Sequence, residues 1–124
     1  MTEIRMNLNV PSGKVELNVG QLKIVSFKKG SHLVAQCLEF DVAVQGNDLS
    51  ELAQRMAHSL ATHALIDMHH GRDPLKTLPP APQHYHTLYN NATPLRQAPN
   101  VPASLLPALS ATSRAVRDAT FAMV

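Results

Sequence analysis

The sequence predicts an α+β fold in which an antiparallel β-sheet packs on one long helix. Apolar and polar residues alternate from Ile4 to Val19, and short apolar runs rich in β-branched residues follow between positions 22 and 45. Such patterns are typical of strands. From Leu49 onward the apolar residues recur every three or four positions, which indicates a helix. We therefore expect residues 1–71 to form one α+β domain, consisting of a β-hairpin and a β-β-β-α core, within a chain of 124 residues.

The hairpin is predicted at the start of the chain. Ile4, Met6, Leu8 and Val10 alternate with polar residues, and the alternation resumes at Val15, Leu17 and Val19. The intervening Pro-Ser-Gly at 11–13 consists of residues that are typical of turns, so we expect a turn there. We expect both strands to join the same sheet as the strands that follow.

Three further strands are expected in the core of the domain. They cover 22–28, 33–38 and 41–45. Lys29-Gly30 forms the first turn, because glycine tolerates the positive φ that a tight hairpin turn requires. Glu39 and Phe40 form the corner between the second strand and the third.

The long helix is predicted to begin after Asp48. The carboxylate of this residue can cap the amides of the first turn, and Glu51 follows three positions later. Leu65, Ile66 and Met68 widen the apolar surface near the end of the helix, so we expect the tail or a second subunit to cover them. Gly71 is expected to end the helix.

Residues 72–124 are predicted to be a proline-rich tail that contains short helices. Prolines at 74, 79, 80 and 82 interrupt regular structure. A short helix is expected from Pro82 to Tyr89, and an extended linker from Ala92 to Pro102. The stretch from Ala103 to Met123 has helical spacing of its apolar residues.

The composition argues against a membrane protein, a secreted protein and a nucleic-acid-binding protein. No apolar run approaches the roughly 18 residues that a membrane helix needs, and the N-terminus has no signal-peptide pattern. A single cysteine excludes an internal disulfide, which favours a reducing, cytoplasmic location. The net charge is +2 without a basic run, and tryptophan is absent, so nucleic-acid binding is not expected.

No reactive constellation stands out among the nucleophiles and metal ligands. The seven histidines are not spaced as a metal set, although His84 and His86 could chelate in an extended segment. Cys37 lies within an apolar strand, where cysteine usually packs as a small hydrophobe. The carboxylates Asp48 and Glu51 are accounted for by helix capping. The sequence therefore predicts no catalytic, cofactor-binding or metal-ligating residue.

The stretch from Gly30 to Leu52 carries a motif similar to that of a known family. This stretch resembles the HicB-like antitoxin family, whose members show the pattern G-x-x-V-A-x-C-x-E followed by A-x-Q-G-D-T-L-E-E-A. The residues at the matching places are Gly30, Val34, Ala35, Cys37, Glu39, Ala43, Gln45, Gly46, Leu49 and Glu51. Asn47-Asp48 replaces the usual acidic-Thr pair, and Leu52-Ala53 replaces the second Glu-Ala. The resemblance covers about residues 21–89.

The resemblance implies a partial ribonuclease-H-like fold without nuclease carboxylates. It also implies a non-catalytic protein that masks a small ribonuclease toxin. Together with the broad apolar end of the predicted helix, this leads us to expect a homo-oligomer. The tail departs from the family members that carry a DNA-binding domain, because it lacks two compact helices joined by a turn. We expect Glu39, Phe40 and Asp41, the exposed corner, to be the residues most available to a protein partner. The alternatives are a metal-dependent hydrolase that uses histidines and carboxylates, and an operator-binding regulator.

Overall fold

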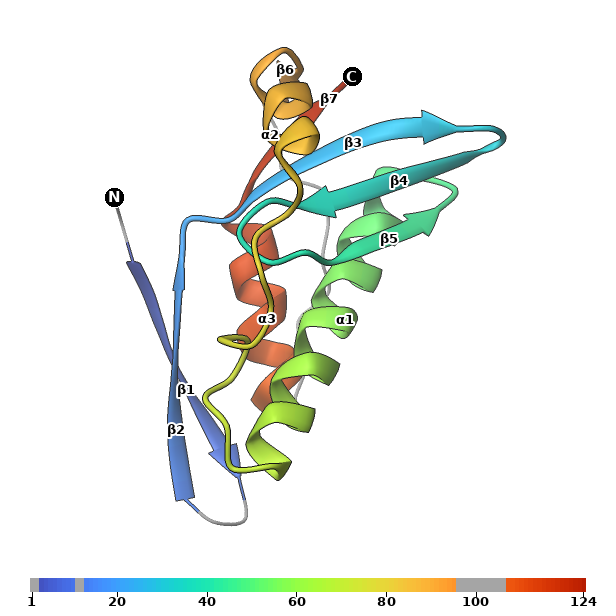
Figure 1. The fold of residues 1–124 in the computed structure, drawn as a ribbon. Coiled ribbons are helices and arrows are strands. Elements are labelled where there is room, and N and C mark those ends of the chain that lie inside the picture. The colour runs from blue at the N-terminus through green and yellow to red at the C-terminus, as the bar shows by residue number, and fades with distance from the viewer. Residues whose placement is uncertain (1–2, 11–12, 96–106) are drawn as a thin grey trace.

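The computed structural model describes residues 3–10, 13–95 and 107–124, and these residues form an α+β fold (Figure 1). They contain a five-stranded mixed sheet, a separate two-stranded sheet and three helices. The elements in chain order are β1 (Glu3–Val10), β2 (Gly13–Gly20), β3 (Lys23–Lys29), β4 (His32–Cys37), β5 (Ala43–Gly46), α1 (Leu49–His69), α2 (Gln83–Asn90), β6 (Thr93–Pro94), α3 (Pro107–Arg117) and β7 (Thr120–Met123). No helix in these ranges is long and apolar enough to cross a lipid bilayer.

The five-stranded sheet has the order β5-β4-β3-β7-β6. The expected antiparallel pairing of β3 with β4 and of β4 with β5 is confirmed. The expectation of a wholly antiparallel sheet is wrong, because β7 runs parallel to β3, with Ile24 opposite Phe121. Parallel neighbours need a long crossover connection, and here the chain passes through all three helices before it returns to β3. Local alternation carries no information about such a distant partner.

The N-terminal hairpin is present, but it does not extend this sheet. Within the described part of the chain, β1 and β2 pair only with each other, with Ile4 opposite Val19. The expectation that they join the main sheet is wrong, because β1 and β2 form a separate two-stranded sheet and the position beside β3 is taken by β7. Figure 1 shows the hairpin beside α3, with which β1 is in contact. The predicted turn at Pro11-Ser12 lies outside the described residues.

The long helix α1 begins where the sequence predicts it. Asp48 is the N-cap, and its carboxylate accepts a hydrogen bond of 2.8 Å from the backbone N–H of Glu51. The helix then lays an apolar stripe against the sheet and α3, and Figure 1 shows both helices on the same side of the sheet. Its fully buried large side chains are Leu52, Met56 and Leu60. Gly71, with a φ of +71°, follows the end of the helix.

The apolar end of α1 is only partly covered. Met68 is half-buried and packs on the core. Leu65 and Ile66 each keep 48% of their surface exposed, so the described part of the tail does not bury them as expected.

The other face of the sheet carries the short helix α2. Val25, Leu38 and Ala81 are buried there, with half-buried side chains from α2 around them, including Tyr85 and Leu88. The rings of Phe27 and Tyr85 stack with their centroids 6.1 Å apart. The position of α2 agrees with the helix expected from Pro82 to Tyr89.

The segment predicted to be a tail also contributes to the main core. α3 falls within the stretch of helical spacing and places Ala115 and Val116 against α1. Thr112 donates a hydrogen bond of 2.8 Å from its hydroxyl to the carbonyl of Ala57. Phe121 of β7 is buried in the same cluster. Most of the predicted linker, from residue 96 onward, lies outside the described residues.

Replacing Ser26 with alanine is expected to leave the protein as stable or to stabilise it by up to about 1 kcal/mol. Ser26 lies in the centre of β3 with no exposed surface, and its hydroxyl oxygen has no hydrogen-bond partner among the residues that the structure describes. Alanine removes a buried polar group that folding must desolvate. Urea unfolding of the variant measures the effect, and a loss of more than about 1 kcal/mol would mean that the hydroxyl is hydrogen bonded in solution.

Candidate functional site

The corner between β4 and β5 holds the three residues that the sequence proposes for partner binding. Glu39 is half-buried, and its Oε1 accepts a hydrogen bond of 2.8 Å from the backbone N–H of Lys23. Phe40 is half-buried against the main core. Asp41 is exposed, and its Oδ1 accepts a hydrogen bond of 3.0 Å from the side-chain amide of Gln36. Each side chain therefore also holds the corner in place.

A proline-rich segment braces this corner from the other side. The backbone N–H of Asp41 donates to the carbonyl of Pro79 at 2.7 Å, and that of Ala81 donates to the carbonyl of Leu38 at 3.0 Å. Pro79 and Pro80 are exposed next to Asp41. We call the surface made by Glu39, Phe40, Asp41, Pro79 and Pro80 the corner surface.

Cys37 lies beneath the corner and is fully buried. Its Sγ is 3.9 Å from Oε1 of Glu39. Burial disfavours the thiolate, and the nearby charge of Glu39 disfavours it further, so that the pKa of Cys37 rises to about 12. The thiolate is the nucleophilic form of cysteine. Cys37 is thus a packing residue, as its apolar strand suggests.

Native protein at neutral pH is expected to react with a thiol reagent far more slowly than unfolded protein. The cause is the combination of full burial and a pKa near 12. The release of thionitrobenzoate from Ellman's reagent, with and without denaturant, measures the difference. Equal rates in the two conditions would contradict this environment.

Tyr89 links α2 to the corner and to β7. Partial burial raises the pKa of Tyr89, the negative charge of Glu39 raises it further, and a hydrogen bond with the side chain of Thr120 opposes the rise. Gln21 also contacts Thr120, with its side-chain amide 3.2 Å from the hydroxyl of Thr120 and 2.6 Å from the carbonyl of Asp118. Tyr89 therefore remains a neutral hydroxyl at physiological pH and serves as a structural contact.

The histidines do not gather in one cluster. Six of them are exposed: His32, His58, His63, His69, His70 and His84. Of these, His69 and His70 are neighbours at the end of α1, with their ring centroids 5.5 Å apart. His86 is half-buried, with Nε2 3.1 Å from the carbonyl of Ala81. Within residues 3–10, 13–95 and 107–124, no group of three or more His, Cys, Asp or Glu side chains could hold a metal ion.

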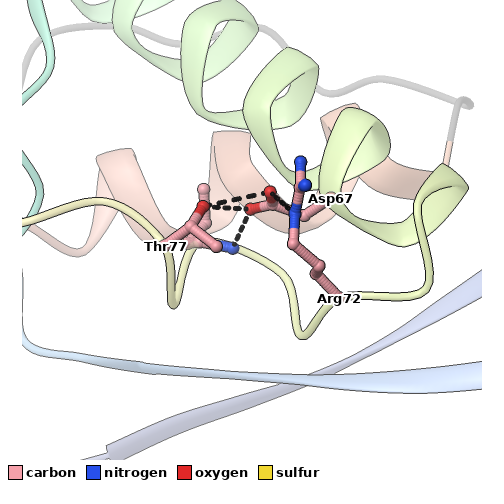
Figure 2. Close-up of polar contacts among 4 residues, drawn as sticks. Asp67, Arg72 and Thr77 are labelled. Carbon is pink, nitrogen blue, oxygen red and sulfur yellow. Dashed lines mark hydrogen bonds and ion pairs between the residues drawn. The ribbon is translucent and has the colours of Figure 1, made fainter.

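A buried carboxylate at the end of α1 is a feature that the sequence analysis misses. Figure 2 shows the carboxylate of Asp67 in contact with Arg72 and Thr77, which belong to the loop that follows the helix. Nε of Arg72 lies 3.2 Å from Oδ1, and the hydroxyl of Thr77 donates at 3.0 Å to the same oxygen. The backbone N–H of Leu75 donates to Oδ2 at 3.0 Å. Asp67 thereby organises the loop, and it is a structural group.

The charge state of Asp67 follows from these contacts. Burial alone would raise the pKa of Asp67, but the hydrogen bonds from Thr77, the Leu75 N–H and Arg72 outweigh it, and the pKa lies below its usual value. Leu75, which this loop drives into the core, has a φ of +66°, a region that side-chain-bearing residues rarely adopt. The carboxylate thus holds a strained backbone in place.

One signal in the sequence could have identified Asp67. It lies three positions after Ala64 on the apolar stripe of α1, in the last turn, where the helix dipole disfavours a negative charge. A carboxylate on a buried face needs paired donors, and Arg72 and Thr77 follow within ten residues.

Comparison of the chain with family models, with curated proteins and with solved structures finds no match.

Proposed function

We propose that this chain is a non-catalytic protein-binding module, antitoxin-like in its core, that assembles into oligomers and masks a small basic ribonuclease. The observation that carries this proposal is the resemblance of residues 30–52 to the HicB-like antitoxin pattern. The remaining observations concern how this stretch is built and what it presents to a partner.

The structural roles of the matching residues support the proposal. Gly30 has a φ of +63° at the turn between β3 and β4, and Cys37 is buried in the core. A Cβ atom on Gly46 would lie 3.2 Å from Oε1 of Glu51, so this position favours glycine as long as Glu51 packs on it. When the residues of a pattern have structural roles that depend on one another, as Gly46 and Glu51 do, the match is better evidence of a shared fold than an accidental one.

The charge of the corner surface suits a basic partner. Asp41 is exposed and Glu39 is half-exposed, while Pro79 and Pro80 add a rigid apolar rim. Carboxylates at an interface steer a cationic protein and select it over acidic ones. Cys37, the reactive side chain nearest to this surface, is buried and protonated. The corner surface therefore favours recognition over chemistry.

Co-expression of the chain with a small basic ribonuclease encoded beside its gene tests the proposal. We expect restored growth, co-purification and loss of RNA cleavage in the purified complex. Asp41→Asn keeps an oxygen that can accept from Gln36 but removes the charge, so it should weaken binding measured by calorimetry. Asp73→Asn is the matched control, because Asp73 is an exposed aspartate in the loop after α1.

Two results would contradict the proposal. The first is the absence of any binding to such a ribonuclease. The second is stoichiometric zinc or manganese in protein purified without an affinity tag, which would favour the metal-dependent hydrolase.

A further inference from the structure

The strand β5 lies at an edge of the sheet, and one side of its backbone pairs with no strand among residues 3–10, 13–95 and 107–124. The N–H of Cys37 donates to the carbonyl of Val42 at 2.9 Å, and Ala35 is opposite Val44. Successive residues of an edge strand direct their backbone groups alternately toward and away from the neighbouring strand. Ala43 and Gln45 therefore direct their N–H and C=O groups away from β4, at the open edge.

One side chain reaches this edge from the helix below. Nη1 of Arg55 donates a hydrogen bond to the carbonyl of Gln45. Nη2 of the same guanidinium pairs with Oε1 of Glu51 at 2.7 Å, one helical turn earlier. Glu51 in turn packs against Gly46 at the end of β5. Arg55 thus lies across the outward carbonyl of the strand and is held there by its partner on α1.

The two edges of the sheet differ in how they are protected. β6, at the opposite edge, is only two residues long and contains Pro94, which has no N–H to donate. Natural edge strands are commonly protected by prolines, charged side chains or short length against pairing with another chain. β5 is short too, but it contains neither a proline nor a charged residue. Among the described residues, the guanidinium of Arg55 occupies one of its outward backbone groups, the carbonyl of Gln45.

We propose that Arg55 keeps β5 closed to strand pairing, and that the strand accepted by β5 once Arg55 is removed is β5 of a second copy of this chain. Antiparallel pairing centred on Val44 places Ala43 of one copy opposite Gln45 of the other, so that their outward N–H and C=O groups meet. The four uncharged residues of β5 bring no repulsion into this pairing. The proposal goes beyond the proposed partner binding and does not depend on it.

Arg55→Ala in the full chain tests the proposal. The variant should self-associate with an association constant at least about tenfold above that of the natural sequence, since a hydrogen bond from a charged donor no longer competes for the Gln45 carbonyl. Light scattering coupled to size-exclusion chromatography over a range of concentrations measures the mass. The runs use low and high salt, because Asp41 and Asp48 flank the strand and would approach each other in the pair.

Second variants separate strand pairing from other causes. Ala43→Pro removes the outward N–H and leaves the bonds to β4, so adding it to Arg55→Ala should restore the original mass; Gln45→Pro serves the same purpose should the first double variant fail to fold. Gln54→Ala, an exposed neighbour on α1, should change nothing. An unchanged mass for Arg55→Ala at every concentration overturns the proposal. So does association that both proline variants leave intact, or a lower mass when Ala43→Pro is placed in the natural sequence.

Discussion

Replacing Phe121 with alanine is expected to lower the free energy of unfolding by about 4 kcal/mol. Phe121 is buried in β7, directly beside Ile24 of the central strand. Its loss removes the largest side chain of β7 from the core and leaves a cavity between the sheet and the helices. Urea unfolding monitored by far-ultraviolet circular dichroism measures the change. A loss of about 4 kcal/mol is a large part of the free energy of unfolding of a domain of this size, which is typically about 5–15 kcal/mol.

Val124→Ala is the matched control for Phe121→Ala. Val124 continues the same strand, with its N–H bonded to the carbonyl of Ser26 at 2.9 Å, but its surface is 63% exposed. It should therefore cost little. Equal effects of the two substitutions would mean that β7 is not packed into the core.

Replacing Asp67 with alanine is expected to destabilise the protein by about 3 kcal/mol. The substitution leaves the buried N–H of Leu75 without an acceptor and frees a loop whose Leu75 holds a φ of +66°. Arg72 and Thr77 lose the oxygens that they share. Thermal or urea unfolding measures the change. Asp73→Ala is the control, because its pair with Lys76 is largely exposed and should contribute little.

The same carboxylate predicts a dependence of stability on pH. Its pKa is lower in the folded protein than in the unfolded chain. Its stabilising contribution is therefore complete above the unfolded value, about 4, and is lost as the pH falls through the folded value. We expect the natural sequence to lose stability more steeply in acid than Asp67→Ala does. Parallel acid profiles would contradict this assignment.

The sequence predicts the local elements well, because their signals lie in neighbouring residues. The strands around Ile24 and Ala35 and the helix that Asp48 caps are found within a few positions of where the patterns place them. The parallel position of β7 could not be predicted from Thr120–Met123, since four residues of strand do not specify a partner about 100 positions away. The separate sheet of the hairpin could not be predicted either, since its alternation does not specify which strands it pairs with.

The corner that carries the candidate site could be predicted in position but not in detail, and partner binding there stays a prediction. The corner at Glu39, Phe40 and Asp41 is present, because apolar strands on both sides leave a polar interruption there. That Glu39 binds the N–H of Lys23, and that Pro79 braces Asp41, depends on chain segments brought together only by the fold. The Asp67 cluster is of the same kind, because its donors come from a loop that proline content suggested was irregular.

The placement of β7 also governs how the chain can fold. β3 pairs with β4 across a tight turn, but its other edge pairs with β7, residues 120–123, which are synthesised much later. During synthesis, the central strand of the sheet therefore keeps one edge unpaired until residues 120–123 have been made. Closure over such a separation is slow, and an unpaired central edge invites association with other chains. We expect slow refolding whose yield falls as the protein concentration rises.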